Sequence, residues 1–236
     1  MTNPANPCDK LFQRLKRIFK LRFAVLYPAG AWALWALRCD ANSLRLGSCV
    51  VAAGLLVRSW ANGYAIKMDK LTTSGPYAFL RHPLYAGTLL MVAGFAVILR
   101  AGWLGAAFVV FFAVVYWGTM RSEERMLTDK FGDAYRNYRA EVPPLWPALR
   151  AYAAGEKWPF ARERYWRSQE YKLILWTAVS VLVIFLRTEW DLASGVWNGR
   201  MTAAAAGIVL LAAADGVITA VLKTAVLKSR SHSAHA

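Results

Sequence analysis

Residues 75–87 read GPYAFLRHPLYAG, and this stretch decides which fold the chain can adopt. It is polar and punctuated by glycine and proline, yet it lies between two strongly apolar segments. A membrane protein rarely places Arg81, His82 and two tyrosines at the start of an apolar helix unless something charged or polar binds there. The stretch therefore predicts a ligand site at the boundary between membrane and water.

The composition indicates a protein of the lipid bilayer. Of the 236 residues, 57% are hydrophobic, and the formal net charge is +15. A chain this apolar is not typical of a soluble domain, whereas basic loops between apolar segments suit anionic lipid head groups. Nucleic acid is not an expected partner, because the basic residues flank apolar segments and form no single stripe.

The three cysteines indicate neither a disulfide framework nor a metal site. They are Cys8, Cys39 and Cys49, an odd number without the spacing of metal ligands. No metal-binding residues are therefore expected.

Six apolar segments predict an all-α fold, a polytopic transmembrane helical bundle with about six crossings. They lie near residues 22–37, 46–62, 84–99, 103–120, 171–186 and 201–222. Most approach the length of about 20 residues that crosses a bilayer. The third and fourth are separated only by residues 100–102, which predicts a tight hairpin of antiparallel helices. Five crossings are an alternative if one short segment re-enters the membrane.

The loops and the N-terminal arm predict how the bundle is oriented. Residues 8–22 place apolar side chains on one helical face among many Lys and Arg, which is typical of an amphipathic helix on the membrane surface. A cytosolic cap on the bundle is the alternative for this segment, residues 1–21. The distribution of Lys and Arg fits both termini in the cytoplasm, so the ligand site is expected to face the cytoplasm.

His82 and Pro83 predict where the third apolar helix begins. Proline suits the first helical position, so the free N–H groups and the positive dipole end lie beside Arg81 and His82. That end of a helix suits an anion such as a carboxylate. His82 is either a ligand contact or a helix cap, and Gly87 serves either the close approach of a ligand or helix packing.

Two acidic residues, Glu123 and Glu124, follow the fourth apolar segment. Glu123 is expected to be solvated. If the helix ends here, its C-terminus disfavours acidic side chains, so Glu124 requires a cationic partner, namely Arg81, Arg121, Arg125 or a ligand ammonium. If the helix continues into residues 125–140, this electrostatic objection is removed. An anion-binding helix start next to a carboxylate fits an amino-acid-like zwitterion, which S-adenosylmethionine carries beside its sulfonium.

A third acidic residue, Asp215, lies inside the last apolar segment. A carboxylate within a membrane segment is a candidate functional residue. The alternative is a hydrogen-bonded contact between helices, because Gly216 and Thr219 are close in sequence.

Three motifs in order resemble those of the isoprenylcysteine carboxyl methyltransferase and phospholipid N-methyltransferase superfamily of integral-membrane enzymes. They are GPY and RHPLYAG within residues 75–87, EERML at 123–127, and FGDAYRNY at 131–138 continuing to Val142-Pro143 and Pro147. The resemblance covers residues 46–147, a methyltransferase-like core within a single membrane domain of residues 1–236. Residues 171–222 lie outside it and form an extra helical pair, which could widen the bundle, build an acceptor site or mediate a homo-oligomer.

The resemblance implies that S-adenosylmethionine binds on the cytosolic side and that a lipophilic or small-molecule acceptor enters from the bilayer. His82, Tyr85 and Glu124 would hold the methionine part of the cofactor. The other residues assigned to the cofactor site are Tyr77, Arg81, Leu84, Gly87, Glu123, Tyr138 and Val142. The catalytic roles fall to Arg121, near the place where the prenylcysteine enzymes have an arginine beside the acceptor, and to Glu124.

The implied reaction is methyl transfer to a lipidic or small apolar acceptor: a phospholipid amine, a prenylcysteine-like carboxylate or a thiol. The chain departs from many relatives at Pro144, where they have a basic residue. One alternative is an NADPH-dependent reductase of the sterol and steroid type, but Leu84 and Thr88 stand where those enzymes have Asn and an acidic residue. The other is a non-enzymatic membrane scaffold.

Overall fold

The computed structural model describes residues 37–66 and 70–233. The predicted amphipathic helix at residues 1–21 and the first apolar segment up to residue 36 lie outside this part. The chain divides into two compact units, Met1–Arg38 and Cys39–Ala236, and the elements described below belong to the second.

The second unit is helical. Its elements are α2 (Ala41–Tyr64), the 3-10 helix η1 (Gly75–Ala78), α3 (Pro83–Ile98), α4 (Gly102–Phe131), α5 (Asp133–Glu141), α6 (Arg162–Arg167), α7 (Glu170–Leu192) and α8 (Gly199–Ser233). By length and composition, α2, α4, α7 and the first 24 residues of α8 can cross a membrane, and α3 is a shorter apolar helix. These helices confirm the predicted all-α membrane bundle. The number of crossings and the orientation stay predictions.

The helix α4 is longer than the predicted segment at 103–120. It continues without a break through both glutamates to Phe131, because residues 121–131 contain neither glycine nor proline and are mostly good helix formers. Gly132, with a φ of 54°, ends it. The alternative that the helix continues beyond Glu123 and Glu124 is therefore confirmed, and the two residues do not lie at a helix C-terminus.

The helices α2 and α3 pack with their backbones close together. A Cβ atom at Gly54 would lie 2.6 Å from the carbonyl oxygen of Gly87, and one at Gly87 would lie 2.7 Å from that of Gly54. Gly47 and Gly94 face each other in the same reciprocal way, seven residues from the first pair along each helix. Small residues at an interface allow this approach in membrane helices. Gly87 thus faces α2, which agrees with the alternative that it serves helix packing.

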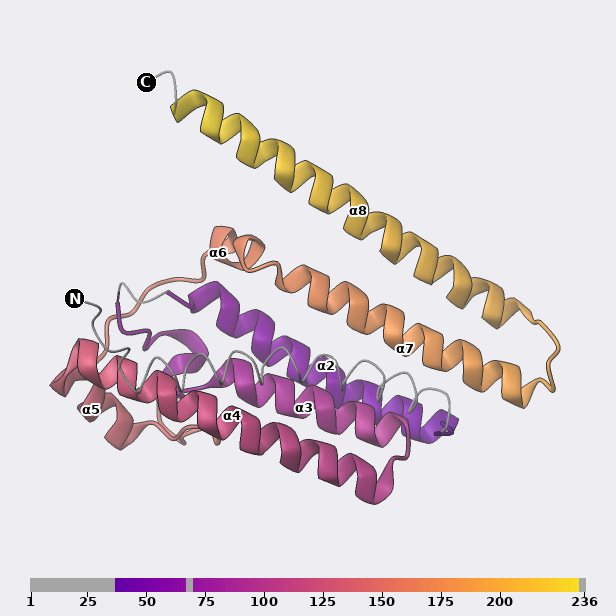
Figure 1. Ribbon diagram of the computed structural model, residues 1–236, viewed down its shortest axis with the longest axis horizontal. Coiled ribbons are helices and arrows are strands. Elements are labelled where there is room, and N and C mark those ends of the chain that lie inside the picture. Colours follow the sequence, from indigo (N-terminus) through magenta and orange to yellow (C-terminus); the bar gives the residue numbers. More distant parts are fainter. Residues whose placement is uncertain (1–36, 67–69, 234–236) are drawn as a thin grey trace, which may run out of the picture. The chain divides into compact units, whose positions relative to one another are not determined.

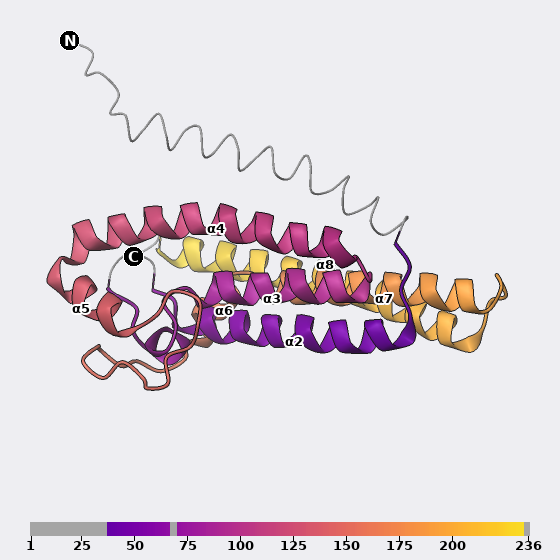
Figure 2. The same cartoon turned by 90° about the horizontal axis from the view of Figure 1, so that it is seen from below.

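Figures 1 and 2 show α3 beside both α2 and α4. The turn of residues 99–101 joins α3 to α4, with Arg100 and Gly102 at positive φ, so the predicted tight hairpin is present. The helices α7 and α8 form a second hairpin, and α7 also contacts α2. Because α3 and α4 form a hairpin, the start of α3 lies beside the later part of α4, and the site described below is located there.

The connector between α5 and α6, residues 142–161, is hydrogen-bonded through its backbone to the segment that precedes α3. The backbone N–H groups of Arg81 and His82 donate to the carbonyl oxygens of Pro143 and Pro144, at N···O distances of 3.0 and 3.1 Å. Two N–H groups of the connector donate in return to the carbonyls of residues 78–79. Backbone hydrogen bonds thus fix the positions of Arg81 and His82 independently of the contacts of their side chains.

We expect Gly54→Ala to lower the thermal midpoint of the protein in detergent. The added methyl group would meet the carbonyl oxygen of Gly87 at 2.6 Å and Met91 Cγ at 2.8 Å. Overpacking of this kind costs roughly 1–3 kcal/mol, against a gain in helix propensity of at most about 1 kcal/mol. Gly118→Ala is the matched control, because a Cβ there would meet nothing within 4 Å. A midpoint for Gly54→Ala at or above that of the control would contradict the close packing.

Candidate functional site

His82 joins the start of α3 to the acidic pair on α4. Its backbone is the N-cap residue and Pro83 is the first helical residue, as predicted, but the His82 side chain makes no capping hydrogen bond. The ring is instead buried, and its Nε2 lies 3.3 Å from Glu124 Oε1. Since no side chain of the N-cap satisfies them, the N–H groups of the first turn of α3 keep their capacity to bind an anion.

Glu124 is a buried carboxylate surrounded by cationic or protonatable groups. Its Oε1 lies 2.7 Å from Arg81 Nη1, and its Oε2 lies 3.9 Å from Arg139 Nε. The side chains of Glu124 and Arg81 are only 10% and 9% exposed, whereas Arg139 is about half exposed. Of the partners considered for Glu124, the structure selects Arg81. A buried charge of this kind becomes costly when its partner is removed.

Glu123 occupies the neighbouring position with a different environment. The Tyr85 hydroxyl donates to Glu123 Oε1 at 2.6 Å, and His82 Nδ1 lies 3.7 Å from its other oxygen. The expectation of a merely solvated Glu123 was wrong, although its side chain is 40% exposed. Both ring nitrogens of His82 thus face carboxylates, one buried and one open to solvent.

Two buried polar groups in this cluster lack hydrogen-bond partners within the part of the chain that is described. They are Arg81 Nε and the hydroxyl of Tyr135, and the Arg81 guanidinium lies near that hydroxyl without the geometry of a hydrogen bond. Arg81 Nη1 is close to Glu124 but is not aligned for a hydrogen bond. Burial, followed by the negative charge of Glu124, raises the pKa of Tyr135, so its hydroxyl stays a neutral donor. Buried donors are normally paired, so these groups suit the polar atoms of a ligand.

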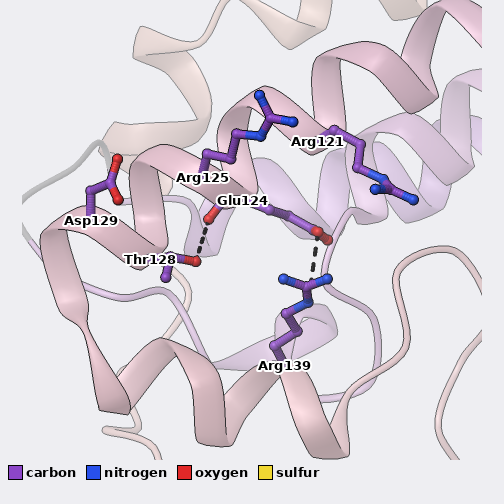
Figure 3. A pocket seen from close by; sticks show the side chains of 6 residues that line it. All are labelled: Arg121, Glu124, Arg125, Thr128, Asp129 and Arg139. Atoms are coloured by element: carbon purple, nitrogen blue, oxygen red, sulfur yellow. Dashed lines mark hydrogen bonds and ion pairs between the residues drawn. The ribbon is translucent and has the colours of Figure 1, made fainter.

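An open pocket of about 340 Å³ lies beside Glu124. Figure 3 shows Arg139 reaching from α5 toward the Glu124 carboxylate, and shows the Thr128 hydroxyl donating to the Glu124 carbonyl. The residues that line the pocket are Arg121, Glu124, Arg125, Thr128, Asp129 and Arg139. Three arginines against two carboxylates make the lining net positive, which suits a ligand with an anionic group.

A smaller space of about 80 Å³ continues from this pocket toward the buried cluster. It shares Arg121, Glu124 and Arg139 with the larger pocket, and Arg81 also lines it. Arg121, which was predicted to be catalytic, lines both spaces, and its guanidinium lies 5.0 Å from the centre of the Trp117 ring. Glu124 therefore contacts both the interior cluster and the open pocket.

Several predicted cofactor residues support the site rather than line these pockets. The Tyr138 hydroxyl donates to the carbonyl oxygen of Tyr77 at 2.6 Å, and Tyr138 and Val142 belong to one buried cluster. Burial raises the pKa of Tyr77, so its hydroxyl is neutral. The Leu84 carbonyl accepts from a side chain of α2, and Gly87 packs on that helix.

Arg139 and Tyr135 belong to the site but were not predicted. Both lie on α5, four residues apart, and therefore on one face of that helix. This spacing was the available signal, since it aligns a buried hydroxyl with a guanidinium next to the third motif.

Asp215 lies away from these pockets on α8. Its Oδ1 is buried without a hydrogen-bond partner among the described residues. One turn further along α8, the Thr219 hydroxyl lies 3.5 Å from that of Tyr171 on α7. Asp215 is thus associated with the second hairpin, and not with the Glu124 cluster.

Residues 49–134 match the family model of phospholipid methyltransferases. They include α3, the Arg-His-Pro motif and both glutamates of α4. This match confirms the predicted resemblance of the core to the isoprenylcysteine carboxyl methyltransferase and phospholipid methyltransferase superfamily. Within the superfamily, the chain is 34% identical over 118 residues to the protein-S-isoprenylcysteine O-methyltransferase of Schizosaccharomyces pombe, covering 47% of each chain.

Two bacterial relatives carry other names. The cobalt-zinc-cadmium resistance protein CzcN of Cupriavidus metallidurans is 32% identical over 117 residues, covering 49% of this chain and 54% of that protein. The nickel-cobalt-cadmium resistance protein NccN of Alcaligenes xylosoxydans xylosoxydans is 30% identical over 112 residues, covering 47% and 52%.

The chain thus spans about half the length of these relatives. No solved structure matches it. Among the residues that the structure describes, no group of three or more His, Cys, Asp or Glu side chains is placed to hold a metal ion.

We expect Tyr138→Phe to reduce the free energy of unfolding at neutral pH by about 1 kcal/mol, the usual net contribution of one hydrogen bond. Burial raises the pKa of the Tyr138 hydroxyl. Its neutral form therefore stabilises the fold fully below the unfolded pKa of about 10, and this contribution is lost as the pH rises further. Denaturant titration in detergent at pH 7 and above pH 10 should show the difference between the two proteins shrinking. A constant difference, or none at pH 7, would contradict this role.

Proposed function

We propose that this protein is an S-adenosylmethionine-dependent membrane methyltransferase. The observation that carries the proposal is the buried Glu124 carboxylate. It is held by Arg81 and His82 at the uncapped start of α3 and opens on its other side into a basic pocket. The match of residues 49–134 to the phospholipid methyltransferases supports it.

The residues present fit the zwitterionic methionine part of this cofactor. The partnerless donors, Arg81 Nε and the Tyr135 hydroxyl, together with the first turn of α3, suit a carboxylate. Glu124 and Glu123 supply the negative charge that an ammonium or a sulfonium requires. We assign the binding of the methionine part to these five elements, with Tyr85 orienting Glu123 through its hydrogen bond.

When bound, S-adenosylmethionine would supply an activated methyl group, which passes to the acceptor and leaves S-adenosylhomocysteine. The task of the protein is then to position two reactants and to exclude water. Buried Arg81 and His82 keep Glu124 in one place, so no side chain has to reorganise when ligands arrive. A carboxylate acceptor needs no base, whereas an amine or thiol must lose a proton. We propose the partly exposed Glu123 carboxylate as the base that takes this proton.

The pocket lining favours an acceptor with an anionic group. Arg121, Arg125 and Arg139 surround the opening next to Glu124, and guanidinium groups bind carboxylates and phosphates through paired hydrogen bonds. We therefore propose a lipophilic acceptor that carries a carboxylate or a phosphate near the methylated atom. The membrane helices would let such a molecule approach from the bilayer, with the cofactor arriving from the cytoplasm.

Calorimetric titration of the purified protein in detergent tests the class of cofactor. S-adenosylmethionine and S-adenosylhomocysteine are expected to bind saturably, and NADPH is not. Binding of NADPH alone would replace the proposal with a reductase. Absence of binding by all three, in protein shown to be folded, would replace it with a non-enzymatic role.

We expect His82→Ala and Glu124→Gln each to weaken S-adenosylmethionine binding at least tenfold, or about 1.4 kcal/mol. Both changes remove one contact of the buried cluster, while glutamine keeps the shape of the side chain. Glu156→Gln is the matched control, since Glu156 pairs with Lys70 on the exposed surface. Unchanged affinity in folded His82 and Glu124 variants would remove the cluster from the cofactor site.

Asp215→Asn is expected to leave the affinity for S-adenosylmethionine unchanged. Asp215 lies on α8, which packs on α7 and contributes no residue to the pockets beside Glu124. Calorimetry on this variant beside the wild type checks the expectation. A tenfold loss would show that the second hairpin shapes the cofactor pocket.

A further inference from the structure

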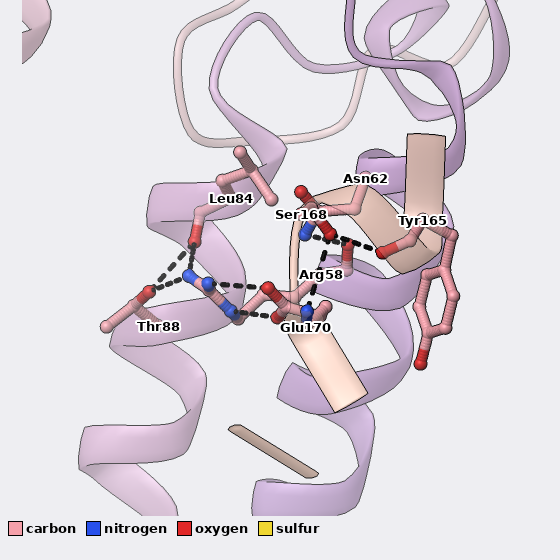
Figure 4. A network of polar contacts seen from close by, with 7 residues as sticks. All are labelled: Arg58, Asn62, Leu84, Thr88, Tyr165, Ser168 and Glu170. Atoms are coloured by element: carbon pink, nitrogen blue, oxygen red, sulfur yellow. Dashed lines mark hydrogen bonds and ion pairs between the residues drawn. The ribbon is translucent and has the colours of Figure 1, made fainter. Parts of the chain in front are cut away.

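An arginine inside the apolar helix α2 links three helices. Arg58 is 19% exposed, and its guanidinium makes four hydrogen bonds to partners on two other helices (Figure 4). Charged residues within membrane helices are costly and are kept where they pair. Arg58 is not part of the pockets beside Glu124, so a different role has to account for it.

One side of the guanidinium binds the first residue of α7. Nε and Nη2 of Arg58 donate to Oε1 and Oε2 of Glu170, at 2.7 and 3.1 Å, and the Glu170 side chain is 6% exposed. Paired bonds of this geometry are among the strongest between side chains. The N-terminus of α7 also favours a negative charge. Glu170 lies outside the residues that match the methyltransferase family.

The other side of the guanidinium binds the first turns of α3. Nη1 of Arg58 donates to the Leu84 carbonyl oxygen at 3.1 Å and to the Thr88 hydroxyl at 2.6 Å. Leu84 stands between His82 and Tyr85, whose side chains contact Glu124 and Glu123. Arg58 on α2 thus binds this turn on one side. On the other side, His82 and Tyr85 bind the glutamates of α4.

We infer that Arg58 and Glu170 are positioning residues that tie the C-terminal hairpin to the ligand site. Glu170 orients the guanidinium, the guanidinium fixes the first turn of α3, and that turn sets His82 and Tyr85 against the two glutamates. The C-terminal hairpin then controls the affinity of the site without touching the ligand. The part of this inference that concerns ligand affinity rests on the proposed function.

Hydrogen exchange on the full-length protein tests the inference without a ligand. Glu170→Gln is expected to raise the exchange rate of the amides in residues 84–88 at least fivefold. The same variant should weaken S-adenosylmethionine binding three- to tenfold. Glu156→Gln, which loses an exposed partner of Lys70, should change neither. Unchanged exchange in residues 84–88 of Glu170→Gln would overturn the inference, whatever the ligand result, whereas failure of the wild type to bind the ligand would count against the proposed function alone.

Two further variants separate positioning from simple attachment of the hairpin. Thr88→Val removes one acceptor of Arg58 but leaves the pair with Glu170 intact, so positioning predicts faster exchange in residues 84–88 at an unchanged thermal midpoint. The exchanged pair Arg58→Glu with Glu170→Arg can restore the ion pair but places no donor near the Leu84 carbonyl. Glu170→Gln is also expected to lower the thermal midpoint, because it breaks the ion pair with Arg58. Positioning predicts that the exchanged pair recovers this midpoint but not the protection of residues 84–88. Recovery of both would show that the pair only attaches the hairpin.

Discussion

Glu124 places a negative charge inside a helical protein at the point where α3 begins, and the surrounding structure is arranged to hold that charge. Arg81 and His82 lie beside it because the backbone of residues 81–82 is paired with the connector after α5. Arg139 reaches it because α5 turns back at Gly132. A buried carboxylate without these partners would carry a large desolvation cost. The connector, the turn and the start of α3 therefore depend on one another.

The sequence predicted the parts of this arrangement that are local. Proline after His82 marks the first residue of α3, and the Arg100–Gly102 turn marks a hairpin, because both signals depend on the conformational limits of single residues. From charge alone, the possible partners of Glu124 could be narrowed to three arginines or a ligand ammonium. The choice of Arg81 could not be made, since it depends on the backbone pairing between residues far apart in the chain.

Other features that the sequence did not reveal have the same origin. The length of α4 was underestimated because its apolar character ends near residue 120 while its helical character continues to Phe131. Tyr138 stays a predicted cofactor residue, and its hydroxyl donates to a backbone carbonyl in a buried cluster, a contact that sequence spacing does not reveal. No role was predicted for Arg58, because it is a single basic residue in an apolar segment. Its partner, Glu170, lies 112 positions away.

The unbroken length of α4 sets a depth in the membrane. This helix has 30 residues, and a rise of about 1.5 Å per residue places Glu124 about 33 Å along the axis from Gly102. That distance is close to the thickness of the hydrocarbon core, about 30 Å. A helix that starts at one face of the bilayer at Gly102 therefore presents its carboxylate at the level of the head groups on the other face. In the proposed methyltransferase, the helix would select acceptors by where their reactive atom resides in the lipid leaflet, because an atom buried among the acyl chains would lie too deep to meet the carboxylate.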